Sequence, residues 1–111
     1  MSQEENARPV RPYDESCPVE RMALLIGRKW TLLIIRDLGQ GRRRFGELQK
    51  SLTGISPRTL SQRLSTLAEE GLITRRIYAE VPPRVEYSLT DKGQALLPLI
   101  EAMRAYGSRW L

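Results

Sequence analysis

The chain has 111 residues and a hydrophobic share of 41%, values that fit one domain with a modest core and exclude a disordered chain. Its formal net charge of +5 at pH 7 favours a polyanionic partner such as nucleic acid, although charge alone fits a basic protein without such a partner equally well. With no histidine and one cysteine, the chain lacks the commonest general base and cannot form an intrachain disulfide or a paired-cysteine metal site.

Residues 1–15 are predicted to form a flexible N-terminal arm. They combine polar and charged side chains with two prolines and have almost no apolar periodicity. Arg8 and Arg11 could reach into a DNA groove, but a disordered tail is the preferred interpretation. Residues 16–111 would then form the single folded domain.

Two helices are predicted next, at residues 18–26 and 29–38. Cys17 is the expected N-cap of the first helix, with Pro18 in its first turn and Gly27 at its end. The second helix is apolar enough to be covered on more than one side. Its expected inner stripe, broadened by Leu32 and Ile35, consists of Trp30, Leu33, Ile34 and Leu38.

Cys17 allows two interpretations. A thiolate at a helix N-terminus is stabilised by the helix dipole, and Arg21 would add to this, which favours a redox sensor. Asp14 and Glu15 act against it, and a small capping residue without redox chemistry fits equally well. Any disulfide of this single cysteine must join two subunits or a small thiol.

A helix-turn-helix motif is predicted between residues 45 and 70. Residues 45–52 read as a short helix, and a glycine-containing turn leads to a second helix opened by Ser56 and Pro57. Leucines at helical spacing bury one face of this second helix, while its other face is polar. Two short helices joined in this way are typical of DNA-binding proteins.

The polar face of the second helix carries the main candidate DNA contacts. Arg58 and Gln62 are expected to face base edges, since arginine pairs with guanine and glutamine with adenine. The expected phosphate contacts on this helix are Ser56, Thr59 and Arg63. The alternative is a solvated surface, which Glu69 and Glu70 would fit, but recognition helices enter the groove by their N-terminal residues.

A two-stranded wing is predicted after Gly71, with strands at residues 72–78 and 84–89 and a turn at Pro82 and Pro83. Arg84 is the preferred wing residue for DNA contact, and at most one of Arg75 and Arg76 should face DNA because the two alternate sides. Further candidate phosphate anchors, each equally compatible with a solvated charge, are Lys29, Arg43 and Arg44.

A long last helix should follow Thr90 and end near Leu111, with Pro98 kinking it or marking its effective start. Its wide apolar stripe contains more apolar side chains than the core of so small a domain can bury, so another surface must cover them. A partner subunit is the simplest cover, so we expect a two-fold homodimer that also uses the first helix.

Six segments together resemble the HxlR-type winged helix-turn-helix transcriptional regulators. They are CPVE at 17–20, GRKWT at 27–31, RFGEL at 44–48, GISPRTLSQRL at 54–64, EGLI at 70–73 and VPPRVEYSLT at 81–90. The departures are Arg28, where the family often has a second glycine, and the dense basic run at 42–44. The resemblance implies an α+β fold and a homodimer on pseudo-palindromic operator DNA, with an interface built from the first and last helices. It also implies that oxidants or electrophiles act on some members through the cysteine that starts helix one.

We therefore expect a sequence-specific DNA-binding transcriptional regulator, with repression as the expected sign and an oxidant or small-molecule effector as its input. The alternative is a winged-helix interaction module that binds protein or RNA without operator specificity. The chain lacks a glycine-rich phosphate loop and a GxSxG nucleophile pattern, so neither enzyme activity nor a cofactor is expected. Without a spanning apolar run or a signal peptide, it is expected in the cytoplasm.

Overall fold

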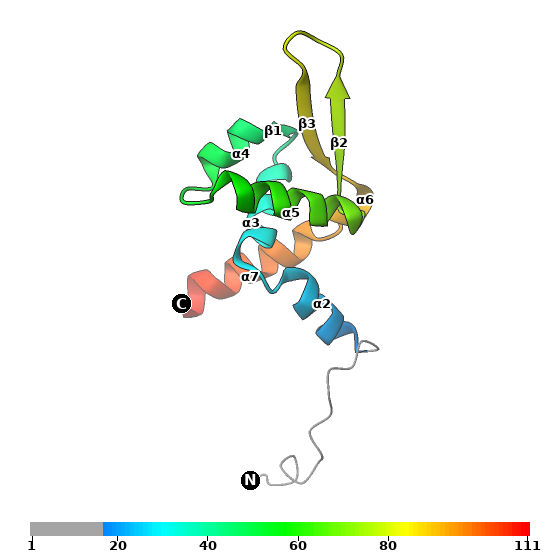
Figure 1. Cartoon of the computed structure of the whole chain (residues 1–111). Coiled ribbons are helices and arrows are strands. Elements are labelled where there is room, and N and C mark those ends of the chain that lie inside the picture. Colours follow the sequence, from blue (N-terminus) through cyan, green and yellow to red (C-terminus); the bar gives the residue numbers. More distant parts are fainter. Residues whose placement is uncertain (1–16) are drawn as a thin grey trace, which may run out of the picture.

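The computed structural model describes residues 17–111, and the predicted arm at 1–15 lies outside them. The fold is the expected α+β winged helix (Figure 1). In chain order the elements are α2 (Pro18–Ile26), α3 (Lys29–Leu38), β1 (Arg43–Arg44), α4 (Phe45–Ser51), α5 (Pro57–Glu69), β2 (Ile73–Tyr78), β3 (Arg84–Leu89), α6 (Asp91–Gln94) and α7 (Leu97–Trp110). The β2–β3 hairpin projects at one end of the molecule, and α2 and α7 lie toward the other. No helix in the described part of the chain is both long and apolar enough to cross a bilayer.

The sheet has three antiparallel strands in the order β1-β3-β2, one more than the predicted two-stranded wing. The extra strand, β1, places Arg43 opposite Tyr87 and Arg44 opposite Glu86. On the other side of β3, Arg76 of β2 is also opposite Glu86. Directly opposed residues point to the same side of a sheet, so Arg44, Glu86 and Arg76 share one face.

The core packs α3, α4 and α5 against the inner face of the sheet. Its fully buried side chains include Ile34 and Ile35 of α3, Leu48 of α4 and Leu60 of α5. The predicted stripe of α3 is partly confirmed, because Ile34, Leu38 and the broadening Ile35 are buried. Trp30 and Leu33 are only partly buried, while Thr31 and Asp37, which were not part of the predicted stripe, are buried. The buried face of α3 is therefore rotated toward α4, α5 and the sheet.

Asp37 is a buried carboxylate that joins α3 to the end of α4. Its Oδ2 accepts a hydrogen bond from the Ser51 hydroxyl, and its Oδ1 accepts one from Arg36 Nε at 3.0 Å. These bonds satisfy an ionised group that would otherwise be costly to bury. The carboxylate thus fixes the first helix of the helix-turn-helix motif against its neighbour.

The predicted last helix is divided in two. Thr90 caps α6, and its hydroxyl accepts a hydrogen bond from the backbone N–H of Gly93 at 3.1 Å. The chain turns at Ala95 and Leu96, and Pro98 lies in the first turn of α7, so this proline marks the effective start of the long helix.

The start of α6 is bonded to the segment that links α5 to β2. Thr90 donates its backbone N–H to the Leu72 carbonyl at 3.0 Å and its hydroxyl to the Gly71 carbonyl at 2.6 Å. Lys92 Nζ donates to the Glu70 carbonyl at 2.7 Å. Gly71 has a φ of +76°, a conformation that glycine adopts without strain. These bonds hold the C-terminal end of α5 in a defined position.

Candidate nucleic-acid interface

Helix α5 separates an apolar face from an exposed polar face. Leu60, Leu64 and Leu67 are at most 2% exposed, and they anchor the helix to the core. Arg58 and Gln62, four residues apart on the opposite side, are exposed. Side chains at this spacing lie one turn apart and point the same way, so both are available for a partner in front of α5.

The N-terminus of α5 is built by Ser56 and Thr59. Ser56 Oγ accepts a hydrogen bond from the Thr59 backbone N–H at 3.0 Å and donates to Thr59 Oγ1 at 2.9 Å. Ser56 is therefore committed to the cap, while the hydroxyl proton of Thr59 remains able to reach an anion. A helix N-terminus also favours negative charge through its free N–H groups.

Arg63 lies on a different flank of α5 from Arg58 and Gln62. Together with Thr66 and Glu70, it faces a cavity shared with α2 and α3. Its Nε is buried and has no hydrogen-bond partner in the described residues. Arg63 is partly exposed on this flank, and its phosphate contact remains a prediction.

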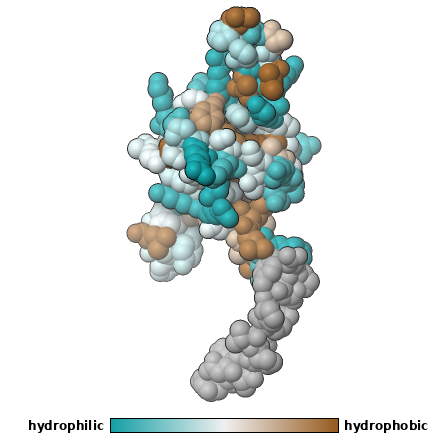
Figure 2. All heavy atoms as spheres, in the orientation of Figure 1, coloured by the Kyte–Doolittle hydropathy of each residue, from teal (hydrophilic) through white to brown (hydrophobic). Residues whose placement is uncertain are grey.

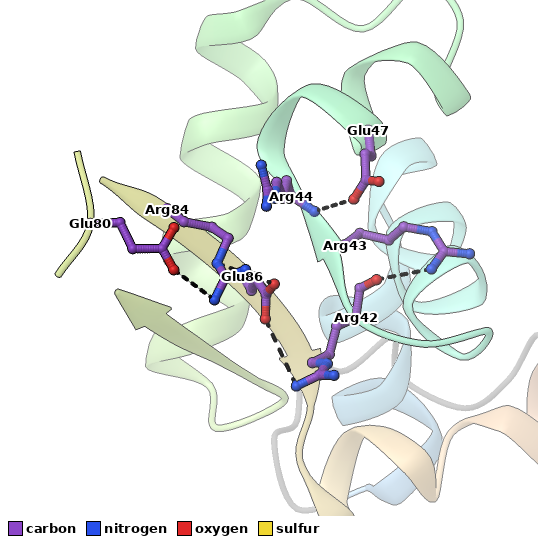
Figure 3. A network of polar contacts seen from close by, with 7 residues as sticks. All are labelled: Arg42, Arg43, Arg44, Glu47, Glu80, Arg84 and Glu86. Carbon is purple, nitrogen blue, oxygen red and sulfur yellow. Dashed lines mark hydrogen bonds and ion pairs between the residues drawn. The ribbon is translucent and has the colours of Figure 1, made fainter. Parts of the chain in front are cut away.

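Four arginines lie around Glu86 on the outer face of the sheet, and we call this set, Arg42, Arg44, Arg76 and Arg84, the arginine cluster. Figure 3 shows Arg42, Arg44 and Arg84 beside Glu86. Arg42 approaches Glu86 Oε1 at 3.9 Å, and Arg84 Nε approaches Glu86 Oε2 at 3.7 Å. Arg44 and Arg76 are the cross-strand neighbours of Glu86. Four cations around one carboxylate give this face a net positive charge, which suits a phosphate backbone.

Arg84, the predicted wing contact, is held along this face. Its guanidinium pairs with Glu80 at 3.0 Å and stacks 3.9 Å from the ring centre of Tyr78, and the side chain is 28% exposed.

Arg75 and Arg76 point to opposite faces of the sheet, as predicted, and Arg75 lines a groove with Tyr87 and α5. The sequence analysis did not predict the arginine cluster, because the cluster depends on the pairing of β1 with β3. The dense basic run at 42–44 was its signal in the sequence.

The other predicted phosphate anchors do not form one patch. Lys29 is at the start of α3, with Nζ 4.6 Å from the ring centre of Trp30. Arg43 and Arg44 follow the other end of α3. Arg43 is half-buried and donates to the Arg42 carbonyl at 2.9 Å, while the backbone N–H of Arg44 donates to Glu47 Oε1 at 2.8 Å.

Replacing Glu86 with glutamine should increase affinity for non-specific duplex DNA by about threefold to tenfold at low salt, because the central carboxylate no longer competes with phosphates for Arg42 and Arg84. The dependence of log K on log salt should steepen by about 0.9 for each further phosphate that the variant neutralises. Fluorescence anisotropy over a salt series measures both quantities.

Glu101→Gln is the matched control, since Glu101 pairs with Arg104 on the surface of α7, away from the arginine cluster. Equal affinities and slopes for wild type and Glu86→Gln would remove the arginine cluster from the interface.

Two helices carry apolar side chains that the monomer leaves uncovered. Among the described residues, helix α2 has no buried side chain, and the only buried side chain of α7 is Ile100. The exposed apolar side chains on these helices are Val19, Leu24, Met103, Tyr106, Trp110 and the adjoining Leu111. Figure 2 shows hydrophobic surface near the α2 end and at the hairpin tip, where Val81 is fully exposed. Cys17, the N-cap of α2, is partly buried.

Comparison with known proteins places this arrangement in a family. A regulator from Synechocystis named as HTH-type is 43% identical over 106 residues, covering 96% of this chain and 78% of its own length. YvaP of Bacillus subtilis, also named as an HTH-type transcriptional regulator, is 39% identical over 98 residues, or 87% and 91% of the two chains.

Solved structures of transcriptional regulators also resemble this chain. A MarR-family regulator of Porphyromonas gingivalis superposes with a TM-score of 0.85 at 42% identity, over 94% of this chain and all of the other. The oxidised form of the redox regulator HypR superposes with a TM-score of 0.79 at 36% identity, over 84% of this chain and 96% of the HypR chain. The model of the HxlR-like helix-turn-helix family matches residues 25–111. The chain belongs to the HxlR-like helix-turn-helix family of transcriptional regulators.

Proposed function

We propose that this protein binds specific operator DNA as a homodimer, with one α5 in each of two successive major grooves. The observation that carries the proposal is the exposed pair Arg58 and Gln62 on a helix whose opposite side is locked into the core. Half-sites bound by such a dimer would lie about 34–36 Å apart along the duplex.

Phosphate contacts around each α5 would fix its register in the groove. Thr59 and the α5 N-terminus would hold a phosphate beside the base contacts. Backbone contacts are also assigned to the cations outside α5, namely Lys29, Arg43, Arg44 and Arg84. The net positive charge of the arginine cluster supports this assignment for Arg44 and Arg84, which belong to it.

The dimer would form through α2 and α7. Their exposed apolar side chains need a cover, and a groove lined by Leu33, Ile100 and Met103 continues that surface between α3 and α7. A two-fold arrangement would bury the same patch on both subunits. An effector or a thiol modification at this interface would change the separation of the two recognition helices, and so relieve repression without altering the residues that read DNA.

The proposal is tested by comparing a duplex from upstream of the protein's own gene with random duplex over a salt series. An operator-binding regulator should prefer one site by about 10³-fold or more at physiological salt. An interaction module for protein or RNA would bind both duplexes weakly and with the same salt dependence, and that result would refute operator recognition.

Oxidation should act through Cys17. Hydrogen peroxide converts a thiolate to a sulfenic acid, which condenses with a second thiol to a disulfide and releases water. With one cysteine per chain, the expected product is a disulfide-linked dimer on a non-reducing gel or a mixed disulfide, accompanied by altered operator affinity. If Cys17→Ser and wild type respond to peroxide identically, the redox role is refuted.

A further inference from the structure

The β2–β3 hairpin ends in an apolar tip. The tip residues Val81, Pro82 and Pro83 carry no charge and are exposed, and the exposure of Val81 is complete. The exposed Ile77, which lies opposite Val85 next to the tip, continues this apolar surface. Figure 2 shows the tip as hydrophobic surface at the end of the molecule. Because the tip adds nothing to the core, its side chains leave water only when a partner covers them.

Charged groups lie along the sides of the hairpin and not at its tip. Glu80, the carboxylate beside the tip, pairs with Arg84 at 3.0 Å, which reduces its repulsion of an anion. Arg75 and Arg76 are exposed on the two opposite faces of β2. The hairpin therefore suits a partner that is apolar where it meets the tip and anionic on both sides of it. A DNA groove has this chemistry, because base surfaces lie between two phosphate backbones.

The hairpin is long enough to reach from one DNA groove into the next. Strands β2 and β3 have 6 residues each, and such a strand spans about 20 Å. The centres of adjacent major and minor grooves are half a helical turn apart, about 17 Å along the duplex. The hairpin extends beyond α5 (Figure 1), so a duplex that holds α5 in its major groove would bring a minor groove to the tip.

We propose that Val81 and Pro82 form an apolar wedge that enters the minor groove of the operator, partly unstacks one base step and bends the duplex. The inference rests on the proposed operator binding and adds an activity to it, the deformation of DNA. Apolar wedges in the minor groove, proline among them, kink a duplex by about 20–90°. Two successive prolines suit this contact, because neither has a backbone N–H that would lose its hydrogen bond to water.

The wedge would also contribute sequence preference without a hydrogen bond to any base. Pyrimidine–purine steps such as TA and CA unstack most easily, so binding should favour one of them where the tip enters. A protein partner for the tip is the alternative, but it would leave the arginines on both sides of the hairpin without a role.

The test uses the full-length protein and the operator from upstream of its own gene. The fluorescent adenine analogue 2-aminopurine is placed at successive positions, and its emission increases when it loses stacking. Binding of wild type should increase the emission severalfold at one step of each half-site. Energy transfer between dyes at the two ends of the duplex should report a bend of about 20–90°.

Val81→Ser removes the wedge without touching the core, so the variant should fold as wild type does. It should weaken operator binding about tenfold or more, abolish the increase in emission and reduce the bend. The dependence of log K on log salt should not change, because no phosphate contact is lost. Val81→Ile keeps an apolar tip and should behave as wild type.

The outcomes separate the wedge from operator recognition. If wild type prefers the operator but leaves every step stacked and the duplex straight, or if Val81→Ser matches wild type, the wedge is refuted and operator recognition stands. If wild type prefers no duplex, operator recognition fails and the wedge fails with it.

Discussion

Alanine in place of Arg58 should weaken operator binding by about 1–3 kcal/mol per half-site, a factor of about 5 to 150. Arg58 is exposed on the first turns of α5, where a major-groove helix approaches base edges, and its planar guanidinium matches two acceptors of guanine. Truncation would remove both expected hydrogen bonds and leave the base acceptors unpaired. Preference at one base position of each half-site should relax at the same time, as measured by binding to a panel of single-base operator variants.

Arg58→Lys is the matched control for charge. Lysine keeps the positive charge but lacks the two-pronged donor geometry, so non-specific affinity should stay near wild type while base preference falls. If Arg58→Ala keeps both the affinity and the preference of wild type, Arg58 does not read DNA.

Gly93→Ala should destabilise the fold by about 1–3 kcal/mol or more. A Cβ at position 93 would overlap the carbonyl oxygen of Leu72 and press against Leu89. That carbonyl accepts the Thr90 N–H, so moving it also disturbs the bonds that hold the end of α5. The midpoint of thermal unfolding should fall by about 4–8 °C for each kcal/mol lost.

Gly46→Ala provides the opposite case. A Cβ at Gly46, in α4, would meet no atom of the described residues within 4 Å. Alanine is the better helix former by up to about 1 kcal/mol, so this variant should be as stable as wild type or more so. Calorimetry of both variants tests the contrast, and equal effects would mean that contact with Leu72 does not explain why position 93 is glycine.

The helix-turn-helix motif could be predicted from sequence because its signals are local. A proline in the first turn, a serine N-cap and leucines at helical spacing define α5, and Gly71 ends it. The predicted bounds of α2, α3 and β3 agree with the structure for the same reason. The exposed positions of Arg58 and Gln62 follow from helical periodicity alone.

Features that depend on tertiary contacts could not be predicted. Strand β1 has two residues and no alternating pattern, so only its pairing with β3 reveals it, and the arrangement of arginines around Glu86 follows from that pairing. The buried face of α3 reflects its packing against α2, α4, α5, α7 and β3. The place of Arg63 could not be predicted either, because the cavity that its side chain lines forms only where α2 and α3 meet α5.

Guanine methylation interference tests most directly whether α5 lies in a major groove and reads bases through Arg58. Methylation at N7 blocks one of the two acceptors that an arginine uses on guanine. Methylating one guanine in each half-site should therefore prevent binding of wild type, and Arg58→Ala should be insensitive to methylation at that same guanine. Wild-type binding that tolerates N7 methylation throughout the site, or an interference pattern identical in the two proteins, would contradict the account.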